Sequence, residues 1–481
     1  MESLPAESSA LRPLIVNLDG TLLSSDSLIE SIITLLKRNI FFIFLLPVWL
    51  IKGKAHFKQQ IADRIDLDAS LFPYNDKFLE YLKTEHRIGR RLILATASNE
   101  KIAEAVAEYL GIFDGILASD AKTNLLGRIK LSRLQELYGE KGFDYSANAM
   151  VDLPILRHAE HAILVNPKRG MKQAVERQGL LTQVIDNRVG HPLKPYLRAM
   201  RLHQWLKNIL VFIPLLMAHR IDDPVLFGRA LLAFISFSLC ASSAYILNDL
   251  WDLPNDRQHP TKRNRPFAAG SISILHGILL IPLLLVIAFN LALLLPIPFV
   301  VVLAFYYILT LAYSLRLKQA ALVDVLTLAG LYTLRIIAGA AAVVIVPSFW
   351  LLAFSMSLFL SLALVKRFTE LLTLIQQRQT GTVGRGYRTG DLEMLSQFGC
   401  SSVYMAILVL ALYINSDTVR DFYTRPYIIW LLCPLLLYMV MRIWLLARRD
   451  ELHEDPVVFL IQDRRSQWLA AVGGILLWLA V

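Results

Sequence analysis

Three cysteines are the whole complement of this 481-residue chain. Cys240, Cys400 and Cys433 all fall in apolar segments with no paired spacing, so neither a disulfide framework nor a cysteine-ligated zinc site is expected. Charged residues are scarce too, at 18%, against about 25% for an average soluble protein. The net charge of +10 would suit nucleic acid, but the bases do not form one stripe with stacking aromatics. We therefore expect no nucleic-acid partner.

Hydrophobic residues make up 55% of the chain and are unevenly distributed. Residues 1–187 mix charged and apolar residues like a soluble α/β domain, whereas 188–481 is dominated by long apolar runs. The sequence therefore predicts two domains that meet at this point. The N-terminus lacks the basic and apolar regions of a secretory signal, so we expect the first domain to be cytoplasmic.

The second domain contains nine apolar segments that we interpret as membrane helices of an all-α bundle. They run near 205–219, 226–247, 273–295, 297–313, 321–343, 349–366, 396–414, 426–447 and 466–481. Four connecting loops are rich in Lys and Arg: 248–270, 314–320, 367–394 and 448–465. Because cytoplasmic loops are enriched in these residues, the loops are predicted to face the cytoplasm. Nine spans then place the C-terminus on the outer side.

Between two of these segments, the run 248–270 carries acids first and bases afterwards. Its acidic half, Asn248, Asp249, Asp252 and Asp256, has the spacing of one helical face, and clustered carboxylates suit Mg²⁺. Its basic half contains His259, Lys262 and Arg265, and such bases suit phosphate oxygens. A solvated cytoplasmic loop would explain the bases but not the acids. The run predicts a metal-diphosphate site at a membrane face.

Further polar residues occur within or at the ends of the apolar segments. Asp324 and Arg335 lie eleven residues apart and share one helical face, which suits either a site or a structural salt bridge. The other candidates are Lys207, Asn208, Tyr313, Lys318, Lys366, Arg367 and Glu370. For the bases at span ends, snorkelling to the interface is the alternative interpretation.

Four motifs in order resemble the UbiA superfamily of intramembrane prenyltransferases, nine-helix proteins that hold a Mg²⁺-diphosphate. They are Asn-Asp-x-x-Asp-x-x-x-Asp-x-x-His-Pro-x-Lys-x-x-Arg-Pro-x-Ala-x-Gly at 248–270, Trp205-x-Lys207-Asn208 with Val211-Phe212-x-Pro214, Leu334-Arg335-x-x-Ala338-Gly339-Ala340 and Lys366-Arg367-x-x-Glu370-Leu371. They are most similar to the branch represented by decaprenyl-phosphate phosphoribosyltransferase. Aromatic prenyltransferases usually carry a second acid four residues after Asp324, but here Leu328 stands in that position.

This resemblance implies that phosphoribosyl diphosphate donates a phosphoribosyl group to a polyprenyl phosphate in the bilayer of a bacterial inner membrane. Mg²⁺ would be held by the acidic half of the run, with Asp249, Asp252, Asp256 and Asp324 as catalytic residues. The other polar candidates named above would bind substrate. An aromatic or quinone-type prenyltransferase and a non-catalytic phospho-ligand sensor are the alternatives, and homo-oligomerisation is left open.

In the first domain, apolar runs end in polar tips, as the parallel strands of a doubly wound sheet do. The tips, Asn17-Leu-Asp19-Gly20-Thr21, Thr96, Lys130 and Asn148 to Asp152, resemble the haloacid dehalogenase-like phosphatases over residues 13 to about 167, with a helical cap at roughly 27–88. The resemblance implies a nucleophile at position 17, an acid/base at Asp19 and phosphate ligands at Thr96 and Lys130. Asp19, Asn148 and Asp152 would support a second Mg²⁺.

Position 17 departs from the family, because Asn17 replaces the nucleophilic aspartate. An amide is a poor nucleophile, so we expect this domain to be nearly inactive. A natural pseudo-enzyme and an engineered Asp-to-Asn change both explain the residue. With an aspartate there, the domain would remove the 5-phosphate from polyprenyl-phosphoribose 5-phosphate. Within its cap, the apolar segment 39–51 suits an interfacial helix, with a buried cap helix as the alternative.

Overall fold

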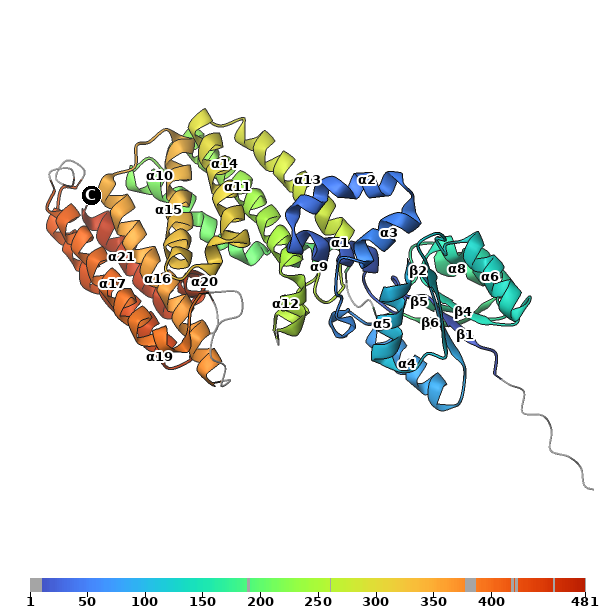
Figure 1. The fold of residues 1–481 in the computed structure, drawn as a ribbon. Coiled ribbons are helices and arrows are strands. Elements are labelled where there is room, and N and C mark those ends of the chain that lie inside the picture. The colour runs from blue at the N-terminus through green and yellow to red at the C-terminus, as the bar shows by residue number, and fades with distance from the viewer. Residues whose placement is uncertain are drawn as a thin grey trace, which may run out of the picture. The chain divides into compact units, whose positions relative to one another are not determined.

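The computed structural model describes residues 11–187, 191–259, 261–376, 386–416, 419, 423–452 and 455–480. Two compact units make up the chain (Figure 1). Unit 1 comprises Met1–Ala199 and Ile246–Leu280, and unit 2 comprises Met200–Tyr245 and Ile281–Val481. Residues 1–10, the predicted boundary at 188–190, parts of the loops 367–394 and 448–465, and Val481 lie outside the described residues.

Unit 1 contains a parallel six-stranded sheet in the order β3-β2-β1-β4-β5-β6 (Figure 1). The strands are β1 Leu14–Val16, β2 Leu92–Asn99, β3 Gly115–Ser119, β4 Asp144–Ala147, β5 Ala162–Val165 and β6 Leu181–Ile185. The central strand β1 is fully buried, and its alternate residues point to opposite faces of the sheet. Leu14 and Val16 belong to one hydrophobic core, and Ile15 belongs to the other. The predicted α/β class is confirmed.

Helices connect these strands, as parallel pairing requires. They are α1 Ser27–Arg38, α2 Leu45–Ile51, α3 Lys54–Ala62, α4 Asp76–Arg87, α5 Glu100–Leu110, α6 Arg128–Tyr138, α7 Leu153–His158 and α8 Met171–Glu176, followed by α9 Lys194–Ala199. Helix α1 begins after Asp26, whose carboxylate accepts hydrogen bonds from the amides of Leu28 and Ile29.

The apolar segment predicted at 39–51 forms η1 Ile40–Phe44 and α2. Trp49 is buried in a cluster with Leu35 and Phe57, while Phe41 and Ile51 are 70% and 85% exposed. One side of the segment therefore belongs to a small core, and the other offers aromatic and aliphatic groups. This exposed face is what an interfacial helix requires, and its membrane contact stays a prediction.

Unit 2 is helical. Seven helices of the described residues, two of which begin or end in unit 1, are long and apolar enough to cross a membrane. They are α11 Pro224–Trp251, α13 Ile274–Ala292, α14 Ile297–Leu315, α15 Val323–Val343, α16 Phe349–Gln376, Thr389–Ile414 (which contains α17 Leu392–Ile414) and Pro426–Arg448 (which contains η8 Pro426–Leu431 and α19 Leu432–Arg448).

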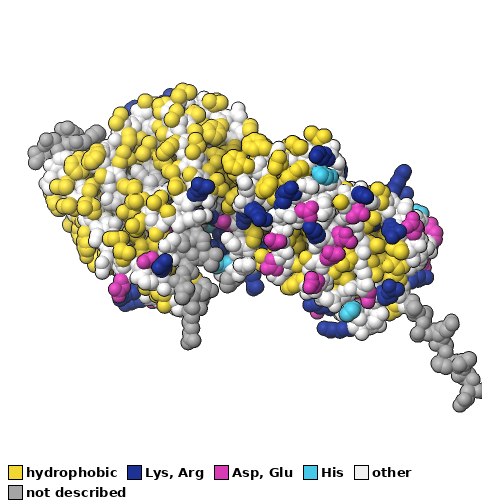
Figure 2. Space-filling view, viewed as in Figure 1, with side chains coloured by type: hydrophobic (Ala, Val, Ile, Leu, Met, Phe, Trp, Pro, Cys, Tyr) yellow, Lys and Arg dark blue, Asp and Glu magenta, His cyan; other side chains and the backbone are white. Residues whose placement is uncertain are grey.

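Two of the nine predicted spans are shorter. One consists of η4 Leu202–Phe212 and α10 Ile213–Met217, and the other is α21 Arg464–Ala480, which follows α20 Pro456–Gln462. The face of unit 2 in view is largely hydrophobic (Figure 2), and Ile308 on α14 is 64% exposed. Soluble monomers rarely expose such large apolar surfaces. Unit 2 is a membrane bundle with seven candidate spans among the described residues.

Helix α15 packs against α14, α16 and η4. At Gly339 the backbone of α15 approaches η4 so closely that an added Cβ would overlap the carbonyl oxygen of Val211. Two of the motifs noted in the sequence therefore meet at this glycine, where no side chain fits. The contact fixes η4, which carries Lys207 and Asn208, against the middle of the bundle.

Replacing Gly339 with alanine is expected to lower the free energy of unfolding by about 1–3 kcal/mol, because the methyl group overpacks the η4 contact. Gly330 on the same helix is a matched control, since an added Cβ there meets nothing within 4 Å. Thermal unfolding of the detergent-solubilised protein should give a lower midpoint for Gly339→Ala and no loss for Gly330→Ala. Equal midpoints for the two variants would contradict this packing.

Candidate functional site

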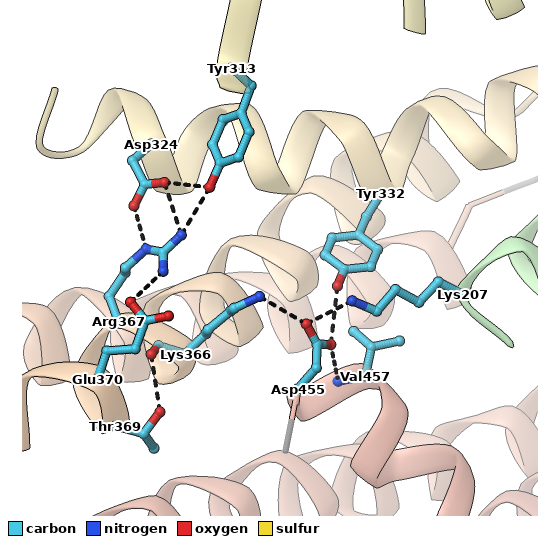
Figure 3. A network of polar contacts seen from close by, with 10 residues as sticks. All are labelled: Lys207, Tyr313, Asp324, Tyr332, Lys366, Arg367, Thr369, Glu370, Asp455 and Val457. Carbon is cyan, nitrogen blue, oxygen red and sulfur yellow. Dashed lines mark hydrogen bonds and ion pairs between the residues drawn. The ribbon is translucent and has the colours of Figure 1, made fainter. Parts of the chain in front are cut away.

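Two buried polar centres lie in unit 2 (Figure 3). The first surrounds Asp324, at the start of α15, which is completely buried. Its Oδ1 accepts hydrogen bonds from Tyr313 Oη at 2.8 Å and Arg367 Nη2 at 3.0 Å, and its Oδ2 pairs with Arg367 Nε. Arg367 is 1% exposed and also contacts Glu370 Oε2 at 2.6 Å. The predicted site residues Tyr313 and Arg367, which are far apart in the sequence, thus meet at Asp324.

The second centre surrounds Asp455, which precedes α20. Its Oδ2 lies 2.7 Å from Lys207 Nζ and 3.1 Å from Lys366 Nζ, and its Oδ1 accepts from Tyr332 Oη at 3.3 Å. The backbone amide of Val457 donates to the same Oδ1 at 3.2 Å (Figure 3). Burial alone would raise the pKa of Asp455, but the ammonium groups of Lys366 and Lys207 outweigh it and hold that pKa well below its usual range.

Arg335 on α15 lies beside the second centre, among aromatic rings that include Tyr332. Its Nε donates to Asn208 Oδ1 at 2.8 Å and its Nη2 to Tyr306 Oη at 3.2 Å. Its Cζ lies 5.2 to 5.5 Å from the ring centres of Tyr306, Tyr332 and Phe237. These contacts orient the guanidinium by amide and cation–π interactions and leave its charge without a carboxylate partner among the described residues.

The alternative of a structural Asp324–Arg335 salt bridge is wrong. Both residues belong to α15, and eleven residues of helix separate them by about 16 Å along the axis. Asp324 pairs instead with Arg367 of α16. A shared helical face was predicted correctly, but it does not bring side chains three turns apart into contact.

The acidic run of 248–270 lies in unit 1. Helix α11 ends at Trp251, and α12 Leu253–Gln258 follows with Pro254 in its first turn, where a missing amide is tolerated. The amide of Asp252 donates to Asn248 O at 2.8 Å, and that of Asp256 donates to Asp252 O at 2.9 Å. The helical spacing of these acids is therefore retained through the break between the two helices.

Asp249 and Asp256 are both buried and converge on one cation. Arg265 Nη1 lies 3.1 Å from Asp249 Oδ1 and 2.6 Å from Asp256 Oδ2. Two carboxylates that already share one positive group fit Mg²⁺, which proteins often bind through one or two carboxylates together with substrate phosphates. Among the described residues no three metal-ligating side chains gather, so the metal roles of Asn248, Asp249, Asp252 and Asp256 stay predictions.

Three other predicted phosphate ligands lie nearer the surface of their units. His259 is exposed at the end of α12, and Lys262 is half-buried in η5 Lys262–Asn264 of unit 1. Lys318 is half-buried in η6 Leu317–Gln319 of unit 2. Their roles also stay predictions.

Within unit 1, Arg257 anchors α12 to the α/β fold. Its guanidinium pairs with Glu30 of α1 through two contacts of 2.6 and 2.7 Å, and it donates to Leu71 O at 3.1 Å and Ala268 O at 3.3 Å. Both partners are less than 10% exposed. The segment that carries the acidic run is therefore held to the first α/β helix by a buried, bidentate ion pair.

Replacing Glu30 with alanine is expected to cost about 3–5 kcal/mol of stability, because it leaves a buried guanidinium unpaired. Glu136→Ala is the control, since Glu136 forms an exposed pair with Arg133, at 63% and 56% exposure, worth at most about 1 kcal/mol. Chemical unfolding followed by tryptophan fluorescence measures the difference. A loss for Glu30→Ala no larger than for Glu136→Ala would mean that the buried pair does not hold α12.

In the α/β fold, the polar tips of neighbouring strands meet around Lys130. Its Nζ donates to Asn17 Oδ1 at 3.2 Å, Ala95 O at 3.1 Å and Tyr145 Oη at 3.2 Å. Tyr145 Oη in turn donates to Asp152 Oδ1 at 3.3 Å. Burial lowers the pKa of Lys130 and raises that of Asp152. This centre gathers the predicted position-17 residue, one predicted phosphate ligand and one predicted metal ligand.

Asp19 lies on the same loop as Asn17. Its Oδ1 accepts from the amide of Ser27 at 2.8 Å, and its Oδ2 accepts from Ser98 Oγ at 2.6 Å. Thr96 is buried within β2, and its hydroxyl accepts a hydrogen bond from the Ser98 amide at 3.0 Å. Gly20, with φ of +71°, leaves room for Asn148, because an added Cβ would overlap the Asn148 amide.

Several residues of these centres were missed in the sequence. Asp455 was overlooked inside a basic loop, although an acid before Pro456 is the usual start signal of a helix. Tyr306 looks like an ordinary aromatic residue of a span, and Tyr145 like an ordinary strand residue. Ser98 had a signal, since it follows Thr96 in the polar tip of a strand.

Comparisons with known proteins agree with the motifs of the membrane half. The model of the UbiA prenyltransferase family matches residues 209–462. An uncharacterized protein, y4nM of Sinorhizobium fredii, is 37% identical over 469 residues, 96% of this chain and 89% of its own length. Nodulation protein NoeC of Azorhizobium caulinodans is 33% identical, over 60% of this chain and 93% of its own. Decaprenyl-phosphate phosphoribosyltransferase of Mycobacterium tuberculosis is 35% identical over 186 residues, 36% of this chain and 59% of its own.

Proposed function

Because the chain belongs to the UbiA prenyltransferase family, we propose that its membrane unit transfers a phosphoribosyl group from phosphoribosyl diphosphate to a polyprenyl phosphate. One relative, which matches 36% of this chain, is a decaprenyl-phosphate phosphoribosyltransferase by name. The positive charge of unit 2 is the main support for this donor. Lys207 and Arg335 lie beside the ring of Tyr332, and Lys207 and Lys366 both pair with Asp455. Among the described residues, no other carboxylate forms an ion pair with these three bases. A donor with an additional phosphate on its sugar requires such charge.

The acids of unit 2 support the same choice of donor. A prenyl diphosphate donor is typically held by two aspartate-rich motifs, but Leu328 stands where a second acid would follow Asp324. Arg367 neutralises Asp324, and Tyr313 donates a hydrogen bond to it. Glu370, beside Arg367, would accept hydrogen bonds from ribose hydroxyls, while the lysines would hold phosphate oxygens.

In the proposed reaction, bound Mg²⁺ would neutralise charge on the leaving diphosphate. Asp249 and Asp256 are the residues that would hold it, with Asn248 and Asp252 beside them. Arg265 would then exchange its carboxylate contacts for phosphate oxygens. The acceptor phosphate is already an anion, so no general base is required. The side chains of the site would act by orienting the two substrates and by stabilising charge.

For unit 1 we propose a haloacid dehalogenase-like phosphate site, with a cap at residues 27–88, whose nucleophile is absent. The contact between Lys130 and Asn17 supports it, because a carboxylate at position 17 would form an ion pair with this lysine. Asp19 would serve as acid/base, Thr96 and Lys130 would bind phosphate, and Asn148 and Asp152 would support Mg²⁺ together with Asp19. With a competent nucleophile the unit would remove the 5-phosphate of the lipid product.

The proposed topology follows from the basic loops. The α/β domain, residues 1–187, would face the cytoplasm of a bacterial inner membrane, and domain 188–481 would cross that membrane nine times, with its C-terminus outside. Fusion of the two activities would keep a scarce lipid intermediate local.

Purified full-length protein tests the membrane function directly. It is incubated with polyprenyl phosphate, Mg²⁺ and radiolabelled phosphoribosyl diphosphate, and the lipid fraction is counted. Labelled lipid is expected. In a parallel reaction, geranyl diphosphate with an aromatic acid should not be consumed. The reverse pattern would favour an aromatic prenyltransferase. If neither reaction gives a product, a non-catalytic phospho-ligand sensor would be favoured.

A further inference from the structure

Asp455 is the one carboxylate that contacts Lys207 and Lys366 among the described residues, and the groups around it resemble a phosphate site. Its oxygens accept from Lys207 Nζ, Lys366 Nζ and Tyr332 Oη, at 2.7, 3.1 and 3.3 Å. These donors come from three elements, η4, α16 and α15, and converge on one small anion (Figure 3). Two ammonium groups and a hydroxyl that share an oxyanion are also the donors that phosphate oxygens use.

The charges at this place are not balanced by Asp455 alone. Arg335 Cζ lies 5.3 Å from the centre of the Tyr332 ring, and Lys207 Nζ lies 5.5 Å from it. Three bases therefore adjoin one carboxylate, in a region where Arg335 and Lys207 are 4% and 7% exposed. Buried charge is costly unless it is paired, so the excess favours an anion with more than one negative charge.

A small pocket adjoins the carboxylate. Tyr332, Lys366 and Asp455 form its polar side, and Leu328, Leu362 and Val457 are among its apolar lining residues. The side chain of Lys366 is 35% exposed, so a ligand in this pocket has access to its ammonium group. Lys366 is thus the most open of the three donors, whereas Lys207 and Tyr332 are both buried.

We propose that Asp455 is a resident competitor, whose carboxylate occupies, in the substrate-free protein, the subsite that takes a phosphate group of the donor. Substrate binding displaces the carboxylate, and Lys207, Lys366 and Tyr332 transfer their hydrogen bonds to phosphate oxygens. The identity of the donor rests on the proposed function, whereas the anion subsite rests on the contacts around Asp455. A purely structural Asp455 would instead only join η4, α15 and α16 to α20.

The test is Asp455→Asn in the full-length protein, with inorganic pyrophosphate as the probe. Asparagine keeps the size of the side chain and removes the competing charge. The dissociation constant for pyrophosphate, measured by calorimetry, is expected to fall about tenfold or more, because the binding-competent state becomes more populated. The KM for phosphoribosyl diphosphate should fall with it. Asp455→Glu retains a competing carboxylate, so its affinity should be no tighter than that of the unmodified chain.

Asp463→Asn is the matched control. Asp463 also precedes a helix and pairs with a base, since its oxygens lie 2.6 and 3.1 Å from the Arg442 guanidinium and accept from the Ser466 amide at 2.8 Å. It does not contact the lysines. Its substitution should leave the pyrophosphate dissociation constant unchanged. Pyrophosphate should raise the thermal midpoint of Asp455→Asn more than that of Asp463→Asn.

The possible results separate this inference from the proposed function. Tighter pyrophosphate binding by Asp455→Asn supports the competitor even if no phosphoribosyl lipid forms, since binding requires no transfer. Unchanged or weaker pyrophosphate binding overturns it, even if the unmodified chain makes the lipid. The thermal midpoint of Asp455→Asn could also fall and not be raised by pyrophosphate. That result would assign Asp455 a structural role and would overturn the competitor proposal.

Discussion

Replacing Asn17 with aspartate is expected to give unit 1 a phosphatase activity at least about a thousandfold above that of the unmodified chain. An amide oxygen attacks phosphorus poorly, whereas a carboxylate can form an aspartyl-phosphate that water then hydrolyses. The surrounding groups are already in place. Lys130 Nζ lies 3.2 Å from Asn17 Oδ1, and Asp19 is oriented by Ser27 and Ser98. Hydrolysis of p-nitrophenyl phosphate with Mg²⁺ measures the gain.

Two further variants sharpen this experiment. Asn17→Asp combined with Asp19→Asn should lose most of the gain, because the acid/base is removed and the size of the loop side chain is retained. Asn17→Ser should stay at background, since serine supplies no carboxylate. If Asn17→Asp shows only background activity, the missing nucleophile does not explain the inactivity of unit 1, and the proposed phosphatase site is wrong.

Asp256→Asn is the second substitution with a large expected effect. Phosphoribosyl transfer should fall about 10²–10³-fold, the loss typical of removing one electrostatic stabiliser from an active site. Asp256 is 3% exposed and lies 2.6 Å from Arg265 Nη1, which also contacts Asp249. The variant leaves one carboxylate of the pair, so the Mg²⁺ concentration for half-maximal rate should rise as well.

Asp222→Asn, a change to an exposed carboxylate in the loop before α11, is the control and should change the transfer rate by less than about twofold. Titrating Mg²⁺ at fixed substrate separates metal binding from general damage. A rate for Asp256→Asn within tenfold of the unmodified chain, at the same Mg²⁺ requirement, would remove the acidic pair from the mechanism.

Much of the architecture was predictable because it depends on patterns along the chain. Buried strands such as Leu14–Val16 gave the α/β class, and apolar length gave most of the spans. Among the described residues, seven of the nine predicted spans are long helices, whereas η4 and α10 form two short pieces and α21 has 17 residues. Apolar composition predicts burial or membrane contact, but it does not fix how far a helix continues.

The candidate site was predicted less completely, because partners across the fold leave little trace in local sequence. Arg367 and Asp324 were both candidates, yet nothing in their spacing paired them. Asp455 was hidden among basic loop residues, and only the three-dimensional contacts with Lys207 and Lys366 reveal it. The motifs contain both lysines, but only the fold shows that they share one carboxylate.

Following the ribose of the donor tests phosphoribosyl transfer most directly. The full-length protein receives polyprenyl phosphate, Mg²⁺ and phosphoribosyl diphosphate with ¹³C in the ribose, and mass spectrometry identifies the lipid product and the released pyrophosphate. The expected lipid carries the five labelled carbons together with the 5-phosphate, and one pyrophosphate is released for each lipid formed. The assignment as a phosphoribosyltransferase would be contradicted if the lipid stays unlabelled and no pyrophosphate is released, while a prenyl diphosphate is consumed in a parallel reaction with an aromatic acid.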